Sequence, residues 1–530
     1  MAIPFDLIFT GGMIIDGSGR PGYAADLAVT GDRIAAIGRI DPSDARKTIP
    51  VAGLAVAPGF IDAHSHSDFT LLADPRAEGK ITQGVTTEIN GNCGMSAAPL
   101  TAKARERREP DLRDLGIASR WQSLAEYFRL LEYAGPSVNT AFLAGHGNIR
   151  GCVVGYEDRR PSDDEIRVMD FLLREALEQG AIGLSTGLIY PPGTYADTDE
   201  LAHLCSGMSA LGGIYTSHMR SEGDSLNQAV QEVIEIGARS GVPVHVSHVK
   251  TAGEENWHKA ESVIEQMENA RLNGIRVSCD CYPYTSSSTD LDSILPSWTY
   301  DGGNERELER LRNPVTRDRI RAEMSGKTGR PGYWDKIVVS SVSSGANAWM
   351  EGKTLAEIGR TIGLDPLDAV FRVLQEEELR VGAIFRSMSE ENKRKFLSLP
   401  YCMIGSDSSS RSFDGPTRRG KPHPRTFGTF PRFLRRYAIE QGVMELHEAV
   451  RRMTSLPAAT FGIQGRGLLR EGMYADIVVF EPGSVTDMAT YEEPFRGPEG
   501  IRFVLVNGEP VVAEGRPTGM RPGRVLRRPA

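Results

Sequence analysis

The middle of the chain alternates short apolar runs with longer segments in which apolar residues recur at helical spacing. Such runs predict buried strands, and the segments between them predict amphipathic helices. Helices are expected at residues 163–179, 225–240 and 256–273, among others. Strands are expected at eight places, namely 59–63, 85–90, 140–144, 181–185, 214–217, 242–246, 275–282 and 402–406. Eight strands alternating with helices favour a parallel α/β fold closed into a (β/α)8 barrel of the TIM type.

Both ends of the chain differ from the middle, because they contain short strand-like runs separated by glycine-rich turns. We therefore expect residues 1–56 and 466–530 to form one small β domain and residues 57–465 to form the barrel. The segment at about 285–400 is too long for a single connection between barrel strands. It carries several helix signals and one strand signal, which predict an inserted subdomain over the barrel mouth.

Side chains that bind metals recur where the predicted barrel strands end. His64 and His66 close the first strand, and on an extended strand two residues this far apart face the same side. The second, fifth, sixth and eighth strands lead to Cys93, His218, His248 and Asp407. Because the chemistry of such barrels lies at the carboxyl ends of the strands, we expect these side chains to meet at one site.

The types of ligand indicate which ion this site prefers. A thiolate combined with imidazoles suits Zn²⁺ better than Mg²⁺ or Ca²⁺, which prefer oxygen ligands. Cys93, His218 and His248 are expected to hold one tightly bound zinc and to leave its fourth position open. His64 and His66 complete a second, weaker position with Cys93 as the bridge. Asp407 then remains available as the catalytic base.

The charge composition limits the classes of partner that the protein is expected to bind. The chain has 61 Lys and Arg against 70 Asp and Glu, a net charge of −9, so neither a nucleic acid nor an anionic membrane is expected to bind. An apolar run of the roughly 20 residues that span a membrane does not occur. The N-terminal residues lack the pattern of a secretory signal, and six cysteines are too sparse for a disulfide framework. We therefore expect a cytoplasmic protein.

The motifs together resemble the N-acyl-D-amino-acid deacylase (D-aminoacylase) family of the amidohydrolase superfamily. The resemblance runs nearly end to end. Its motifs are Gly-Gly-Met-Ile-Ile-Asp-Gly-Ser-Gly, Ala-Pro-Gly-Phe-Ile-Asp-Ala-His-Ser-His, Gly-Asn-Cys-Gly, Ser-His-Met-Arg, Ser-His-Val-Lys, Tyr-Pro-Tyr-Thr, Ile-Gly-Ser-Asp and Ala-Asp-Ile-Val-Val-Phe. It implies zinc held by the ligands above, a catalytic Asp407, and hydrolysis of N-acyl-D-amino acids to a carboxylate and a free D-amino acid. Hydantoinase-like members carry a carboxylated lysine on the fourth strand; residues 181–186 contain none, and Cys93 replaces it.

The substrate's α-carboxylate needs a cation and hydrogen-bond donors beside the metal. Lys250 lies two residues after His248, so it is expected to face the same pocket. Hydroxyl donors are expected from Tyr190, Tyr284 and Ser288, which follow the fourth and seventh strands and match substrate-binding positions of D-aminoacylases. Two alternatives stay open: a cyclic amidase or dipeptidase activity on the same fold, and a non-catalytic scaffold. Metal content distinguishes the scaffold from the enzymes.

Overall fold

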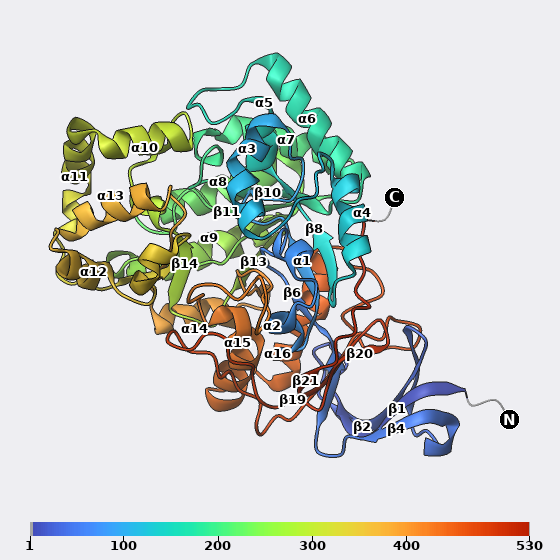
Figure 1. The fold of residues 1–530 in the computed structure, drawn as a ribbon. Coiled ribbons are helices and arrows are strands. Elements are labelled where there is room, and N and C mark those ends of the chain that lie inside the picture. Colours follow the sequence, from blue (N-terminus) through green and yellow to red (C-terminus); the bar gives the residue numbers. More distant parts are fainter. Residues whose placement is uncertain (1–3, 529–530) are drawn as a thin grey trace.

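The computed structural model describes residues 4–528, and its centre is a closed barrel of parallel strands (Figure 1). One sheet has the order β6-β7-β8, and a second has the order β17-β13-β12-β11-β10-β9. These strands span Phe60–Asp62 (β6), Val85–Asn90 (β7), Asn139–Phe142 (β8), Ala144–Gly145 (β9), Gly183–Gly187 (β10), Ile214–His218 (β11), Val244–Val246 (β12), Val277–Cys281 (β13) and Cys402–Ile404 (β17). Their side chains are almost entirely buried, as expected where helices cover a parallel sheet.

Hydrogen bonds at both seams close the two sheets into one barrel. At the first seam β8 runs directly into β9, and the amide of Ile182 donates to the carbonyl of Phe142 over 2.8 Å. At the second seam the amide of Ala63 donates to the carbonyl of Ile404 over 3.2 Å, and a parallel bridge joins Ser65 to Ser408. With β8 and β9 counted as one strand position, the described residues form the predicted eight-stranded barrel.

Helices follow most barrel strands and pack their apolar faces outside them. The longest that lie close to predicted ranges are α6 (Asp163–Glu178), α8 (Leu226–Ser240) and α9 (Ala260–Leu272). The start of α6 is set by a capping box, in which Ser162 and Glu165 satisfy each other's backbone amides. Other outer helices are α3 (Ala102–Asp114), α4 (Leu124–Ala134), α5 (His146–Val153), α7 (Thr198–Ser209), α14 (Glu390–Ser398), α15 (Arg425–Arg432), α16 (Leu446–Met453) and α17 (Ser455–Thr460).

Strands from both chain ends pair into one separate sheet. Strand β5 (Ala55–Pro58) lies antiparallel to β18 (Ile477–Phe480), with Ala55 opposite Phe480. The other strands are β1 (Phe5–Ile14), β2 (Tyr23–Thr30), β3 (Arg33–Gly38), β4 (Ala45–Pro50), β19 (Ile501–Val506), β20 (Glu509–Ala513) and β21 (Arg516–Pro517). In Figure 1 the blue and red strands of this sheet lie beside the barrel. The predicted sharing of one β unit between both ends is confirmed by this pairing.

The long segment after β13 forms its own small sheet with its own apolar core. Strands β14 (Ser286–Asp290), β16 (Gly382–Arg386) and β15 (Ile337–Ser341) pair antiparallel in that order. Four helices pack with them: α10 (Asn304–Arg312), α11 (Pro314–Thr328), α12 (Leu355–Ile362) and α13 (Pro366–Glu376). Figure 1 shows these helices to one side of the barrel. The structure thus contains the inserted subdomain, whereas the predicted domain boundaries stay predictions.

Within residues 4–528, each helix is too short or too polar to cross a membrane.

Candidate metal centre

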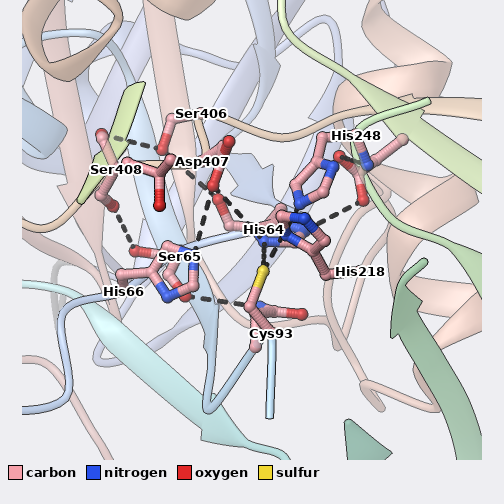
Figure 2. Close-up of polar contacts among 12 residues, drawn as sticks. His64, Ser65, His66, Cys93, His218, His248, Ser406, Asp407 and Ser408 are labelled. Carbon is pink, nitrogen blue, oxygen red and sulfur yellow. Dashed lines mark hydrogen bonds and ion pairs between the residues drawn. The ribbon is translucent and has the colours of Figure 1, made fainter. Parts of the chain in front are cut away.

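Cys93 lies at the centre of a group of imidazoles at the carboxyl ends of the barrel strands. Its Sγ is 3.3 Å from Nε2 of His64 and 3.4 Å from Nε2 of His248. Figure 2 shows the sulfur between the side chains that the sequence predicts as ligands. Two sets of ligand atoms result, with the atoms of each set within 4.8 Å of one another. These sets are His64, His66, Cys93 and Asp407, and Cys93, His218 and His248.

His218 supports a metal in the second set most directly. The residue is 5% exposed, yet neither ring nitrogen has a hydrogen-bond partner among the described residues. Buried imidazoles without partners are costly, because the ring loses its bonds to water and gains nothing in return. The ring centroid lies 4.5 Å from that of His248, so a cation beside Cys93 Sγ is within reach of both rings. The thiolate and imidazole donors fit zinc.

The backbone is held in an uncommon conformation at three of these positions. Cys93, His248 and Asp407 have φ angles of 53°, 35° and 50°, in the left-handed region that favours glycine. Such residues cost about 1–3 kcal/mol each and persist where the surrounding structure fixes them. All three sit where a barrel strand turns away from its neighbours, and the turn directs each side chain toward the shared centre.

Two carboxylates orient the imidazoles from behind. Asp280, on β13, lies 3.2 Å from Nδ1 of His64 and accepts the backbone amide of His248 over 3.0 Å. Glu222 lies 2.9 Å from Nδ1 of His248. In each case the ring turns Nε2 toward Cys93, as in the carboxylate–histidine–metal arrangement that fixes a ring and raises its basicity as a ligand.

The charges of the cluster stabilise a thiolate. Burial opposes ionisation of Cys93, but the positive charges of His64, His66 and His248 hold the pKa of its thiol well below the usual range. Burial likewise disfavours a charged His66, yet the thiolate and a hydrogen bond with Asp407 raise the pKa of that ring to about 9. The thiolate is the form of cysteine that binds a metal.

Asp407 faces the cluster from the eighth strand. Its Oδ1 lies 3.2 Å from Nε2 of His66, and its Oδ2 lies 2.8 Å from Nη1 of Arg425. Burial raises the pKa of this carboxyl, but the guanidinium of Arg425 and the ring of His248 hold it well below the usual range. Asp407 is therefore ionised at neutral pH and able to accept a proton.

A cavity of about 320 Å³ opens above these side chains and includes walls from the inserted subdomain. Three of the predicted substrate contacts, Tyr190, Lys250 and Ser288, line it together with His66, Cys93, His218, His248 and Asp407. Tyr284 lies behind this wall, with its hydroxyl 3.5 Å from a carboxylate oxygen of Asp487. Its role as a substrate contact stays a prediction.

The environment of Lys250 differs from what the sequence suggests. Its Nζ donates to Glu222 and lies 2.8 Å from Nδ1 of His248, so its charge already has a partner. Sequence reasoning missed Glu222, Asp280 and Arg425 as neighbours of the cluster. Only Asp280 had a signal, because it alternates with Cys279 and Cys281 on a strand and must therefore point into the barrel.

A family model described as "Amidohydrolase family" matches residues 47–280 and 410–512, which is more than half of the chain. The chain therefore belongs to the amidohydrolase family.

Comparison with individual proteins shows to which family within the amidohydrolases the chain belongs. A D-aminoacylase of Alcaligenes xylosoxydans xylosoxydans is 40% identical over 99% of this chain and 98% of its own length. A crystal structure of N-acyl-D-glutamate deacylase from Bordetella bronchiseptica contains zinc and a phosphonate inhibitor that mimics the tetrahedral intermediate. That protein is 37% identical to this chain, with a TM-score of 0.82, and the match covers 99% of this chain and 100% of that one. A solved D-aminoacylase structure, which concerns one-metal activation and second-metal attenuation of a binuclear metal centre, is 38% identical to this chain, with a TM-score of 0.84. It covers 99% of this chain and 100% of that one. Within the amidohydrolases, the chain is a member of the D-aminoacylase, or N-acyl-D-amino-acid deacylase, family.

Proposed function

We propose that this protein hydrolyses the amide bond of N-acyl-D-amino acids in a zinc-dependent reaction that yields a carboxylate and a free D-amino acid. The observation that carries the proposal is the cluster of Cys93, His218 and His248 beside the ionised carboxylate of Asp407. The relatives support it, because they are deacylases of this substrate class over nearly the full length of the chain.

The roles of the metal ligands follow from their contacts. Cys93, His218 and His248 are proposed to hold one tightly bound zinc, since His218 has no hydrogen-bond partner among the described residues. His64 and His66 are proposed to hold a second, weaker zinc through the bridging Cys93. When bound, zinc polarises the scissile carbonyl and lowers the pKa of water from near 16 to roughly 7.

Asp407 is proposed to move the proton. Its carboxylate faces the ligand cluster, and Arg425 keeps it ionised and fixes its second oxygen. It accepts a proton from the attacking water and passes it to the departing nitrogen, which would otherwise leave as an unstable amide anion. The pair of Arg425 and Asp407 also limits how strongly the carboxylate holds this proton, because the guanidinium favours the ionised form.

Substrate binding is proposed in the cavity between the metal cluster and strand β14 of the inserted sheet. Lys250 and Arg425 supply positive charge for the α-carboxylate, and Ser288 lies beside Arg425, whose Nη2 donates to its carbonyl over 3.1 Å. The hydroxyl of Tyr190 lies 2.6 Å from Oγ1 of Thr289, and its ring lies 5.0 Å from that of His218. Tyr190 thereby connects the metal cluster to the strand that enters the inserted subdomain.

The proposed partner is a small N-acyl amino acid, and binding of a nucleic acid or a membrane is not expected from the net charge of −9. A cytoplasmic location stays a prediction from the sparse cysteines.

A panel of matched N-acetyl-D- and N-acetyl-L-amino acids tests the function. Purified, zinc-loaded protein is incubated with each, and the released amine is measured before and after treatment with a chelator. We expect release from D substrates, with the L enantiomers far slower, and loss of release after chelation. Activity that persists without metal, or turnover of hydantoins in preference to every linear amide, would contradict the proposal.

A further inference from the structure

Lys80 is a fully buried lysine beneath the metal centre. It belongs to α2 (Glu78–Ile81), a short helix between the first two barrel strands, and its side chain has no exposed surface. Burying an ammonium is costly unless it is paired and hydrogen-bonded. Its pKa is raised because two neighbouring carboxylates outweigh the effect of burial, so the side chain stays charged. Because keeping this charge buried is costly, we ask which groups the ammonium binds.

Five oxygen atoms surround the ammonium, and they come from three barrel strands and the loops that follow them. The closest are Oδ2 of Asp62 at 2.7 Å and Oγ of Ser406 at 2.8 Å. The carbonyl of Ser408 lies at 3.0 Å, Oε1 of Glu88 at 3.1 Å and Oγ of Ser65 at 3.2 Å. One side chain therefore ties the first, second and eighth strands together directly below the site.

These contacts bracket the proposed base. Ser406 and Ser408 are the residues immediately before and after Asp407, and Figure 2 shows all three beside Ser65. The amide of Ser406 also donates to Asp62 over 2.8 Å. The carbonyl of Ser408 accepts three donors: Lys80, the Ser65 hydroxyl at 3.1 Å and the His66 amide at 3.2 Å. Lys80 and its partner Asp62 thus contact the residues on both sides of Asp407, through the hydroxyl and amide of Ser406 and the carbonyl of Ser408. The amide of Asp407 itself donates to the carbonyl of His64 over 2.8 Å.

Asp407 needs such a clamp because its own backbone is strained. Its φ of 50° is unfavourable for a residue with a side chain and persists only where neighbours fix it. Without the clamp, the segment from Ser406 to Ser408 can relax to a common conformation, and the carboxylate then turns away from the cluster. A displacement of about 1 Å in a reacting group is enough to cost roughly 100-fold in rate.

We infer that Lys80 is a positioning residue for catalysis: its ammonium holds Asp407 in its strained, productive conformation by binding Ser406 and Ser408 on either side. Lys80 touches neither substrate nor metal in this account. The inference rests on the proposed function, because it assigns Lys80 an effect on the base of that reaction.

The test compares Lys80→Met with a matched control. Methionine keeps the length of the side chain and removes its charge. Lys393 is also buried, at 2% exposure, but its Nζ contacts Cys281 instead of residues around Asp407. We expect Lys80→Met to lower kcat by about 10- to 100-fold with zinc content and KM nearly unchanged. Lys393→Met is expected to lower Tm while kcat stays within about twofold of wild type.

A double-mutant cycle separates positioning from general destabilisation. If Lys80 acts through Asp407, Lys80→Met lowers the residual kcat of Asp407→Asn by less than about threefold. Because Lys80→Met leaves the buried carboxylates of Asp62 and Glu88 without their cation, a second variant, Lys80→Met/Asp62→Asn, also removes the charge nearest to Lys80. Asparagine still accepts the Ser406 amide, so this variant is expected to regain stability but not kcat.

Two results overturn the inference. One is a folded, zinc-replete Lys80→Met or Lys80→Met/Asp62→Asn enzyme with kcat within about twofold of wild type. The other is that Lys80→Met lowers the kcat of Asp407→Asn by the same factor by which it lowers the kcat of wild type. Failure of the proposed function is a different result, since wild type would then release no amine from any N-acyl-D-amino acid.

Discussion

The two halves of the metal centre share Cys93 but differ in how their other side chains are satisfied. In the half formed with His218 and His248, neither nitrogen of His218 has a hydrogen-bond partner among the described residues, and the nearest carboxylate oxygen, of Glu222, lies 3.9 Å from Nε2. In the half formed with His64 and His66, both rings already have carboxylate neighbours, Asp280 and Asp407. A zinc ion therefore fulfils an unmet need at His218 in the first half, whereas in the second half it competes with the hydrogen bond between Nε2 of His66 and Asp407. The contact of Asp280 with Nδ1 of His64 leaves Nε2 of that ring facing Cys93. This difference is the basis for proposing one tight and one weaker site.

Removing the shared ligand is expected to have the largest effect. Cys93→Ala takes a thiolate from both halves, so most zinc and essentially all activity should disappear while the circular dichroism spectrum is retained. Zinc per chain is measured by atomic absorption. Cys205→Ala is the matched control, because Cys205 is buried away from the cluster in α7. Full zinc occupancy and activity in Cys93→Ala would contradict the assignment.

Asp407→Asn is expected to have the next largest effect and to separate chemistry from metal binding. The amide keeps the shape of the side chain but cannot accept a proton, so kcat should fall by about 10²–10⁴. The tight zinc should remain, because Asp407 belongs only to the weaker half. Steady-state kinetics and zinc content on one preparation check both points. A kcat near that of wild type means that another group is the base.

Lys250→Met is expected to lower kcat/KM about tenfold, because a buried charge-assisted contact contributes roughly 1.5–3 kcal/mol. The loss should vanish for an N-acyl amine that lacks the α-carboxylate. Since Lys250 also contacts Glu222 and His248, an equal loss for both substrates would show that it supports the metal ligand instead.

His66→Asn is expected to have a small effect that sharpens the comparison between the halves. It should lower zinc binding at the weaker site while activity stays within a few-fold of wild type, because His66 lies outside the set of Cys93, His218 and His248. Zinc titration followed by calorimetry measures the two affinities separately. A matching loss of the tight site would show that the halves are not independent.

The low pKa of Cys93 predicts an unusual pH dependence in metal-free protein. An ordinary thiol is alkylated about tenfold more slowly for each pH unit below its pKa, because only the thiolate reacts. Since the charges of three imidazoles outweigh the effect of burial and lower the pKa of the Cys93 thiol, its alkylation by iodoacetamide should fall by much less than tenfold per unit from pH 8 to pH 6. Cys152, whose pKa burial raises, is the internal comparison. A tenfold fall per unit at Cys93 would contradict the charge account, and zinc should protect it.

Much of the barrel and the ligand set could be predicted because both follow local rules. Strand β7 has the predicted bounds, and the ligands lie at strand ends, where parallel strands bring them to one edge. Strand β10 starts two residues later than expected, and the amide of Ala181 still bonds to the carbonyl of Ala176 in α6.

The residues that contact the metal ligands and Asp407 from behind follow no such local rule. Glu222 comes from the loop after β11, and Arg425 is the first residue of α15, whose position depends on the loop before it. Their sequence neighbourhoods carry no period that indicates a direction. Tyr284 shows the same limit: its spacing from the seventh strand suggested a cavity position, but the chain turns it toward Asp487. Lys80 lies in a four-residue helix between two strands, where a lysine is ordinarily solvent-exposed.

The most direct test of the account is a zinc titration of chelated wild-type protein and His66→Asn, with amine release from an N-acetyl-D-amino acid measured at each step. The account predicts that the first equivalent of zinc restores each protein to its own full activity, with His66→Asn within a few-fold of wild type, because it fills the half formed by Cys93, His218 and His248. Activity that appears only with a second equivalent, or that His66→Asn never regains, would contradict it.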